Sequence, residues 1–190
     1  DQCPPEETLL IAKPIYECAS IGIQKESVSC YTKTYEEYLK KATKKFGQPF
    51  IIQEFIVGFE VEVPVIVINN KPCILPPVNL YKDSSFCMEN LFLDFDNIYE
   101  DDYSFCLLED ISKSWVDTIN ELTLKIINLL ELDSYFRIDY RITKKGECYV
   151  TDINSYPHIV THSSFSYAFT KLGFEGSDLL PFLICNKYTN

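Results

Sequence analysis

The chain lacks the long apolar runs that mark membrane proteins. No run of roughly 18 or more apolar residues occurs, which is the length that a membrane-spanning helix needs. Residues 1–7 also lack the basic and apolar regions of a secretory signal peptide. We therefore expect a soluble, cytoplasmic protein that has no membrane partner.

Basic residues are also scarce. Lys and Arg together number 17, against 28 Asp and Glu residues, and the formal net charge is −11. Because the phosphates of nucleic acids select basic protein faces, we expect no nucleic-acid partner. An anionic ligand would need cations placed locally around it.

The eight cysteines contain no C-x-x-C pair, so neither a zinc knuckle nor a thioredoxin-like motif is indicated. An even number of cysteines is compatible with disulfides in a secreted chain. Without a signal peptide, and with enough apolar residues for a core, buried free thiols are the expected state.

The composition is sufficient for a packed core. Of the 190 residues, 46% are hydrophobic and 14% are aromatic. A chain of this size forms one ordinary domain or two small lobes that share a site.

The periodicity of apolar residues predicts a mixture of strands and helices. The expected strands are 8–14, two within 50–68, 71–75 and both arms of a hairpin within 134–157; the expected helices are 35–46, 111–132, 163–172 and 179–184. Thr34 is the expected N-cap of the first helix, and Gly47 ends it. The stretch 76–107 is the least regular, which is typical of a long functional or mobile loop.

The predicted hairpin carries charge on one face. Arg137, Asp139 and Arg141 alternate along its first strand, and Asp152 and Asn154 lie two positions apart on its second strand. Asp139, Asp152 and Asn154 offer only oxygen ligands, which suit Mg²⁺ better than zinc. A solvated polar face with a cross-strand salt bridge explains the same residues equally well.

The R-x-D-x-R strand, the turn and the acid-x-Asn-x-x-Pro strand end resemble the closing motif of the ATP-grasp ligases. The stretch 158–165 resembles the D-alanine–D-alanine ligase branch of that family, and the resemblance extends over about 8–184. It implies an α+β fold of the ATP-grasp type, with two α+β lobes, an antiparallel sheet in each and the nucleotide between them. We expect the small lobe at 1–56, without its usual upstream segment, and the large lobe with the metal-binding hairpin at 57–190.

The resemblance also implies roles for individual residues, with ATP and Mg²⁺ or Mn²⁺ as cofactors. Lys13, at a strand end, and Glu17 and Ser20, in a phosphate loop of the form E-G-S-S-x-G, would contact the nucleotide. Gln53, Glu54, Phe55 and Ile56 would border adenine, and Glu60 would accept the ribose hydroxyls. The catalytic residues would be Arg137, Ser163 and Tyr99, and the metal ligands would be Asp139, Asp152 and Asn154.

The sequence departs from the family pattern at several of these positions. Cys18 and Ala19 replace a glycine and a serine of the phosphate loop, and Ile98 stands where the family has a lysine. Asp152 replaces a glutamate, and His158 replaces a glycine. Two functions therefore stay open, an ATP-dependent amino-acid ligase and a degenerate nucleotide-binding module without efficient catalysis. The expected partners are amino-acid substrates, together with a missing N-terminal domain or a second copy in a homodimer.

Overall fold

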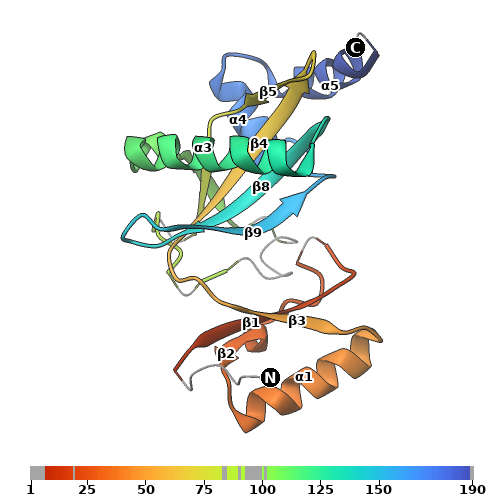
Figure 1. Cartoon of the computed structure of the whole chain (residues 1–190), viewed down its shortest axis with the longest axis vertical. Coiled ribbons are helices and arrows are strands. Elements are labelled where there is room, and N and C mark those ends of the chain that lie inside the picture. Colours follow the sequence, from red (N-terminus) through yellow and green to blue (C-terminus); the bar gives the residue numbers. More distant parts are fainter. Residues whose placement is uncertain are drawn as a thin grey trace. The chain divides into compact units, whose positions relative to one another are not determined.

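The computed structural model describes residues 7–18, 20–82, 85–89, 91–92, 100 and 102–188. The chain divides into two compact units, Asp1–Ile56 with Leu91–Asp102, and Val57–Asn90 with Tyr103–Asn190. Each unit has its own antiparallel sheet and at least one helix (Figure 1). The predicted α+β class with a sheet in each lobe is confirmed. Among the described helices, none combines the length and the apolar character required to cross a membrane.

The first unit is a three-stranded antiparallel sheet with one long helix. Its elements are β1 (Leu9–Pro14), the short helix η1 (Lys25–Ser27), β2 (Val28–Cys30), α1 (Lys33–Phe46) and β3 (Phe50–Glu54), and the strand order is β2-β1-β3. Leu10, Ala12 and Tyr35 are buried together, so α1 packs on the face of β1 that carries Leu10 and Ala12.

The ends of α1 are set by two residues. The side chain of Thr32 accepts a hydrogen bond from the amide of Tyr35, so the N-cap is Thr32. The predicted cap Thr34 is wrong, because Lys33 and Thr34 already belong to the first turn. Gly47 ends the helix in the left-handed conformation with φ 64°, as expected from the sequence.

The second unit is organised around the ten-residue strand β4 (Phe59–Ile68). In its sheet β4 pairs with β5 (Lys71–Ile74), β6 (Val78–Tyr81) and β8 (Tyr135–Ile142), and the order is β7-β6-β4-β8-β9 with β5 beside β4. The edge strands are β7 (Ser104–Leu107) and β9 (Cys148–Asn154). The predicted hairpin is therefore confirmed as β8 and β9.

Alternation along β4 and β8 creates two different faces. One face presents side chains that form a single apolar core with Ile119 and Ile127 of α3 (Lys113–Leu130): Val61, Val63, Val65, Val67, Phe136, Ile138, Tyr140 and Ile142. Burying each such side chain stabilises the fold by about 1.5–3 kcal/mol. The predicted helix 111–132 is confirmed with slightly shorter bounds, and it packs on the hairpin sheet.

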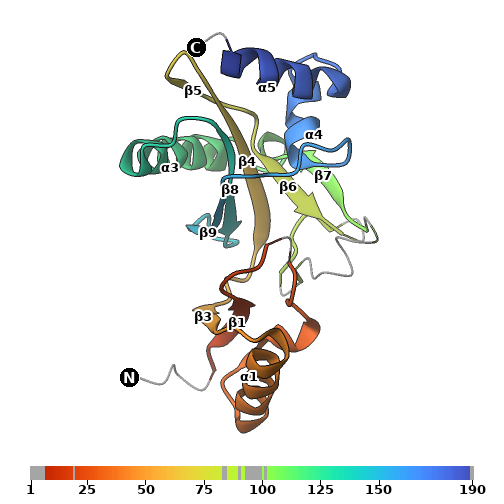
Figure 2. The same ribbon diagram turned by 90° about the vertical axis from the view of Figure 1, so that its right-hand side faces the viewer.

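The other face of the sheet is covered by the C-terminal helices. Figure 2 shows α3 on one side of β4, and α4 (Ser164–Lys171) and α5 (Leu179–Tyr188) on the other. A short helix, η3 (Gly176–Asp178), connects them. Phe165 and Phe169 of α4 are buried. The face opposite α3 therefore receives the start of α4, and this contact positions the site described below.

The expectation of an irregular stretch at 76–107 is wrong in part. Two four-residue strands, β6 and β7, pair there, and the short helix η2 (Leu108–Asp110) follows. The buried Asn79 stands in the middle of β6 and donates a hydrogen bond to the carbonyl of Phe86. Strands this short, with a polar residue turned inward, do not produce a recognisable apolar alternation.

No disulfide joins the cysteines that the structure describes. The expectation of unbridged thiols is confirmed for these residues, but the expectation that they are buried is wrong. Cys18, Cys73 and Cys185 are exposed and the remaining four are half-buried. The apolar faces of the sheets are filled by aliphatic and aromatic side chains, which leaves the thiols at the periphery.

Gly58, directly before β4, provides a test of this packing. A Cβ atom at Gly58 would lie 1.9 Å from the carbonyl oxygen of Ile142, and φ is 156°. Gly58→Ala should therefore lower the free energy of unfolding by about 3 kcal/mol or more. Gly173→Ala is the matched control, since φ is 92° but nothing lies within 4 Å; it should cost about 1–2 kcal/mol. Equal losses in urea unfolding would contradict the close approach of Gly58 and Ile142.

Candidate functional site

Polar side chains gather on the sheet face opposite α3. Residues that lie opposite each other in an antiparallel pair point to the same face. Glu62 of β4 lies opposite Asp139 of β8, and Asp139 lies opposite Asp152 of β9. In the neighbouring row, Arg137 lies opposite Asn154. Like charges placed opposite each other repel, so this row of carboxylates needs a cation beside it.

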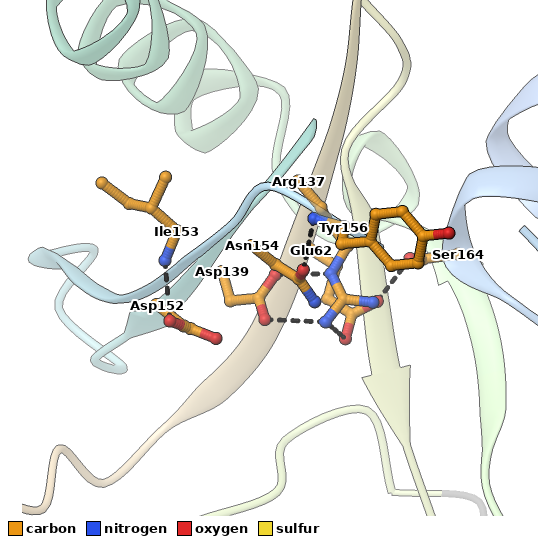
Figure 3. Close-up of polar contacts among 8 residues, drawn as sticks. All are labelled: Glu62, Arg137, Asp139, Asp152, Ile153, Asn154, Tyr156 and Ser164. Carbon is orange, nitrogen blue, oxygen red and sulfur yellow. Dashed lines mark hydrogen bonds and ion pairs between the residues drawn. The ribbon is translucent and has the colours of Figure 1, made fainter. Parts of the chain in front are cut away.

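Arg137 supplies that cation (Figure 3). Its Nε donates to Oδ1 of Asp139 at 2.7 Å, and its Nη2 donates to Oδ2 at 2.8 Å. Nη2 also lies 3.1 Å from Oε1 of Glu62. The three side chains are only 11–15% exposed. A guanidinium carries five N–H donors, and Nη1 has no hydrogen-bond partner among the described residues, so it is available to an anionic ligand.

Glu62 is held from both sides. While Oε1 faces Arg137, Oε2 accepts a hydrogen bond from the hydroxyl of Ser164, the first residue of α4. Burial raises the pKa of Glu62 to about 7, although the charge of Arg137 acts in the opposite direction. The nearby carboxylate of Asp139 raises this pKa further. Glu62 therefore exchanges its proton near neutral pH.

Arg137 is a permanent cation in this environment. Burial disfavours its charge, but the carboxylates of Glu62 and Asp139 outweigh burial and raise the pKa of the guanidinium. Asp152 adds to the same effect. The cluster therefore combines one fixed positive charge with carboxylates on three adjacent strands.

The predicted metal ligands supply a suitable donor set. Oδ1 of Asp152 accepts from the amide of Ile153, and Oδ1 of Asn154 accepts from the amide of Tyr156, each at 2.9 Å. Carboxylate and amide oxygens have two lone pairs, so these bonds and the pair with Arg137 do not use all the acceptor capacity of Asp139 and Asn154. Oxygen donors of this kind fit Mg²⁺ or Mn²⁺.

The donors do not by themselves form a complete metal cage. Within the described ranges, no three His, Cys, Asp or Glu side chains are grouped so that they could hold an ion. Asp152 lies beside the cluster, with its carboxylate turned to the Ile153 amide (Figure 3). Mg²⁺ commonly binds to one or two carboxylates and completes its shell with substrate phosphates and water. The arrangement therefore suits an ion that binds together with a phosphate ligand.

Ser163 already has a structural task. It is 5% exposed, and its hydroxyl donates to the carbonyl of Val160 at 2.8 Å and accepts from the amide of Ser166 at 3.2 Å, as the N-cap of α4. A substrate carboxylate needs a donor, so Ser163 could bind one only by exchanging its bond to Val160. The contact between Ser163 and substrate stays a prediction. His158, five residues earlier, is exposed.

Glu60 is paired with Arg141, and its predicted contact with ribose stays a prediction. Its Oε2 lies 3.5 Å from Nη2 of Arg141 but accepts no hydrogen bond among the described residues, although the atom is buried. Arg141 is 5% exposed and also donates from Nη1 to the carbonyl of Gly58 at 3.2 Å. Arg141 therefore supports the backbone next to Glu60 and does not belong to the cluster around Arg137.

In the first unit, Lys13 and Gln53 share one face of the sheet. Lys13 lies opposite Ile51, and Gln53 lies opposite Ile11, whereas Glu54 lies opposite Leu10 on the face that α1 covers. The structure thus brings Lys13 and Gln53 onto a common surface and places the side chain of Glu54 on the other face.

The predicted phosphate loop is a series of tight turns. Ser20 and Gly22 both have positive φ values, 56° and 82°. The amide of Ile21 donates to the carbonyl of Cys18 at 3.0 Å, and that of Ile23 donates to the carbonyl of Ser20 at 2.9 Å. Glu17 accepts a hydrogen bond from the side chain of Gln48 at 2.8 Å. Glu17 therefore ties the loop to the residue after Gly47, at the end of α1.

The remaining predicted residues have different environments. Phe55 is buried, its amide donates to the carbonyl of Leu9 at 2.8 Å, and its ring packs edge-on against Phe92. The amide of Phe55 is thus committed to the end of the small sheet, and Ile56 after it is half-buried. Tyr99 lies outside the described residues, as do Ala19 and Ile98.

Sequence reasoning missed Glu62 and Ser164. The signal for Glu62 was present, because a second glutamate two positions after Glu60 must point to the same face of the strand. A carboxylate inside the otherwise apolar run of β4 also needs a buried partner. Ser164 carried no comparable signal, since serines at the start of a helix are common for local reasons.

The comparisons with known proteins agree with this architecture. A sequence profile of the family described as "D-ala D-ala ligase C-terminus" matches residues 8–185. The D-alanine--D-alanine ligase of Fervidobacterium nodosum is 30% identical over 183 residues, which are 93% of this chain and 54% of that protein. The D-alanine--D-alanine ligase of Petrotoga mobilis is 28% identical over 188 residues, with 96% and 58% covered. The chain thus spans about half the length of these curated relatives.

Two solved structures show the same fold. A D-alanine--D-alanine ligase from Bacillus anthracis complexed with ATP superposes with a TM-score of 0.68 at 17% identity, and 97% of this chain and 55% of that chain are covered. VanG D-Ala:D-Ser ligase from Enterococcus faecalis gives a TM-score of 0.68 at 22% identity, with 94% and 49% covered. At these identities the similarity concerns the fold.

The raised pKa of Glu62 predicts a pH dependence of stability. The pKa rises from 4.5 to about 7 on folding, so the folded chain binds this proton more tightly than the unfolded chain. The resulting stabilisation is fully present below about pH 4.5 and is lost as the pH rises through about 7. In the presence of a chelator, the free energy of unfolding of the wild type relative to Glu62→Gln should therefore fall across this interval. Glu121→Gln, at an exposed position of α3, is the control, and a flat profile for Glu62→Gln would disprove the assignment.

Proposed function

The chain belongs to the family of D-alanine–D-alanine ligase C-terminal domains, and on this basis we propose that it carries the ATP-binding and phosphoryl-transfer part of an ATP-dependent carboxylate–amine ligase. The observation that carries the proposal is the half-buried Arg137, which two carboxylates fix along one edge while Nη1 stays available to an anion. Positioned positive charge is the main requirement for phosphoryl transfer.

The proposed reaction has two steps. A substrate carboxylate attacks the γ-phosphorus of ATP, the bond to the β-phosphate oxygen breaks, and an acyl phosphate and ADP form. The amine of a second substrate then attacks the acyl carbon, and inorganic phosphate and a proton leave as the amide bond forms. By analogy with the relatives, both substrates are amino acids, with D-alanine as the first candidate.

Each predicted site residue would have a particular role in this reaction. In the first unit, Lys13 and the loop with Ser20 and Glu17 would act near the phosphates, and the backbone of 53–56 would border adenine. In the second unit, Glu60 would accept the ribose hydroxyls, and Arg137 would stabilise the charge on the moving phosphoryl group. Asp139, Asp152 and Asn154 would hold Mg²⁺, which neutralises phosphate charge when it is bound.

We further propose that the amino acids are bound in part by the segment that the relatives possess beyond the matched half. That segment would be provided by another part of the same protein or by a partner, and the location would be cytoplasmic. The alternative of a degenerate nucleotide-binding module is not favoured, because the relatives described above are ligases. Magnesium-dependent protection by ATP in a melting assay, followed by ADP release with candidate amino acids, tests the proposal. Protection without any turnover, in an assay that also supplies the remaining segment, would support the degenerate module.

Replacing Lys13 tests the nucleotide site in the first unit. Lys13→Ala should weaken ATP binding by about tenfold or more, because a charge-assisted contact contributes about 1.5–3 kcal/mol and 1.4 kcal/mol corresponds to a factor of ten. Lys41→Ala, which removes an exposed lysine of α1, should leave the affinity unchanged. An equal affinity of both variants in a titration with ATP would reject the role of Lys13.

Replacing the carboxylates tests the metal centre. Asp139→Asn and Asp152→Asn should abolish the part of ATP protection that depends on magnesium, while both proteins remain folded in the absence of nucleotide. Asp152→Asn removes a carboxylate beside the cluster and relieves repulsion in the ligand-free state. Asp139→Asn also weakens the pair with Arg137, so it should melt somewhat earlier than Asp152→Asn. Asp117→Asn, on the exposed side of α3, is the control and should behave as the wild type. Early melting of both variants with unaffected nucleotide binding would show that these carboxylates serve only as ion-pair partners.

A further inference from the structure

We propose that Glu62 is a positioning residue for Arg137 and that Ser164 fixes Glu62 in the required orientation. The inference rests on the proposed function to the extent that Arg137 acts on a phosphate ligand. Neither Glu62 nor Ser164 has a role in the predicted ligand set, and both lie within the second unit.

The guanidinium of Arg137 is held by carboxylates from two strands. Asp139 lies two residues from Arg137 on the same strand and contacts Nε and Nη2. Glu62 approaches Nη2 from a different strand, β4, at 3.1 Å. A guanidinium held by one carboxylate can still tilt with that side chain, whereas contacts from two strands define its plane. The remaining Nη1 then points in a fixed direction toward its ligand.

Glu62 is itself held in place by Ser164. Ser164 is 1% exposed, and its hydroxyl donates to Oε2, the oxygen that does not face Arg137. Ser164 follows Ser163, whose hydroxyl caps α4 and binds the carbonyl of Val160. The orientation of Glu62, and through it that of Arg137, therefore depends on how the segment before α4 is arranged.

Burying Glu62 as a carboxylate costs free energy. Asp139 alone would balance the charge of Arg137, so a second buried carboxylate adds a negative charge that burial disfavours. The raised pKa of Glu62 reports this cost. Stabilisation of the fold therefore does not account for a glutamate at position 62. Orientation of the Arg137 guanidinium does account for it.

The first experiment observes the guanidinium itself by nuclear magnetic resonance. Restricted rotation of the Arg137 guanidinium should give separate Nη1 and Nη2 signals in the wild type, assigned by their loss in Arg137→Lys. Glu62→Ala and Ser164→Ala should merge these signals, and Ser164→Thr, which keeps the hydroxyl, should restore them. Tyr140→Phe is the control: it removes one buried hydroxyl contact, with Thr123 at 2.8 Å, on the opposite face of the sheet. Unchanged Nη signals in both Glu62→Ala and Ser164→Ala would overturn the proposal, whether or not the chain is a ligase.

The second experiment is a double-mutant cycle on ADP release. Glu62→Gln should lower kcat about tenfold with little change in KM for ATP, which corresponds to a loss of about 1.4 kcal/mol. In an Arg137→Lys background the same substitution should have no further effect, because Glu62 acts through the guanidinium. Additive losses, or a change in KM alone, would contradict positioning. If the wild type neither binds magnesium–ATP nor releases ADP, the proposed function fails and the resonance experiment still decides the role of Glu62.

Discussion

The pairing of Arg137 with Asp139 and Glu62 is the interaction around which the polar face of the second unit's sheet is arranged. Removing charges from water costs several kcal/mol for each ion, and only close partners offset this cost. The sheet supplies them because β4 and β8 pair over eight residues, so that every second position of both strands meets on one face. The apolar positions between them hold α3, and the start of α4 completes the polar side through Ser164. The apolar core on one face of the sheet and the charged cluster on the other face therefore both follow from the alternation of side chains along β4 and β8.

This arrangement explains why the cluster suits phosphate chemistry. A cation that is fixed along one edge keeps its remaining donors in place before the ligand binds, and such preorganisation lowers the cost of stabilising developing charge. The carboxylates of Asp139 and Asp152 lie on neighbouring strands beside it. A site of this kind offers positive charge to an anion and oxygen ligands to a cation. A magnesium nucleotide contains both an anion, its phosphates, and a cation, the metal ion.

Much of this could be predicted from the sequence. The alternation of side chains in 134–157 predicted the hairpin and its polar face, and Gly47 predicted where α1 ends. These features could be predicted because side-chain alternation and helix termination depend on residues that lie close together in the sequence. Glu62, Ser164, the cap Thr32 and the short strands β6 and β7 were missed, since their roles depend on partners distant in sequence or on patterns only four residues long.

The most direct test of the central claim is paramagnetic broadening by Mn²⁺ in the presence of ATP. Mn²⁺ takes the same oxygen ligands as Mg²⁺ and broadens the amide signals of residues close to it. The account predicts that Mn²⁺ with ATP broadens the signals around Asp139, Asp152 and Asn154 selectively, and that Mn²⁺ alone does so much less, because phosphate oxygens complete the coordination. Broadening that is confined to other acidic surfaces, or that is identical without ATP, would contradict the assignment of this hairpin as the site of nucleotide and metal.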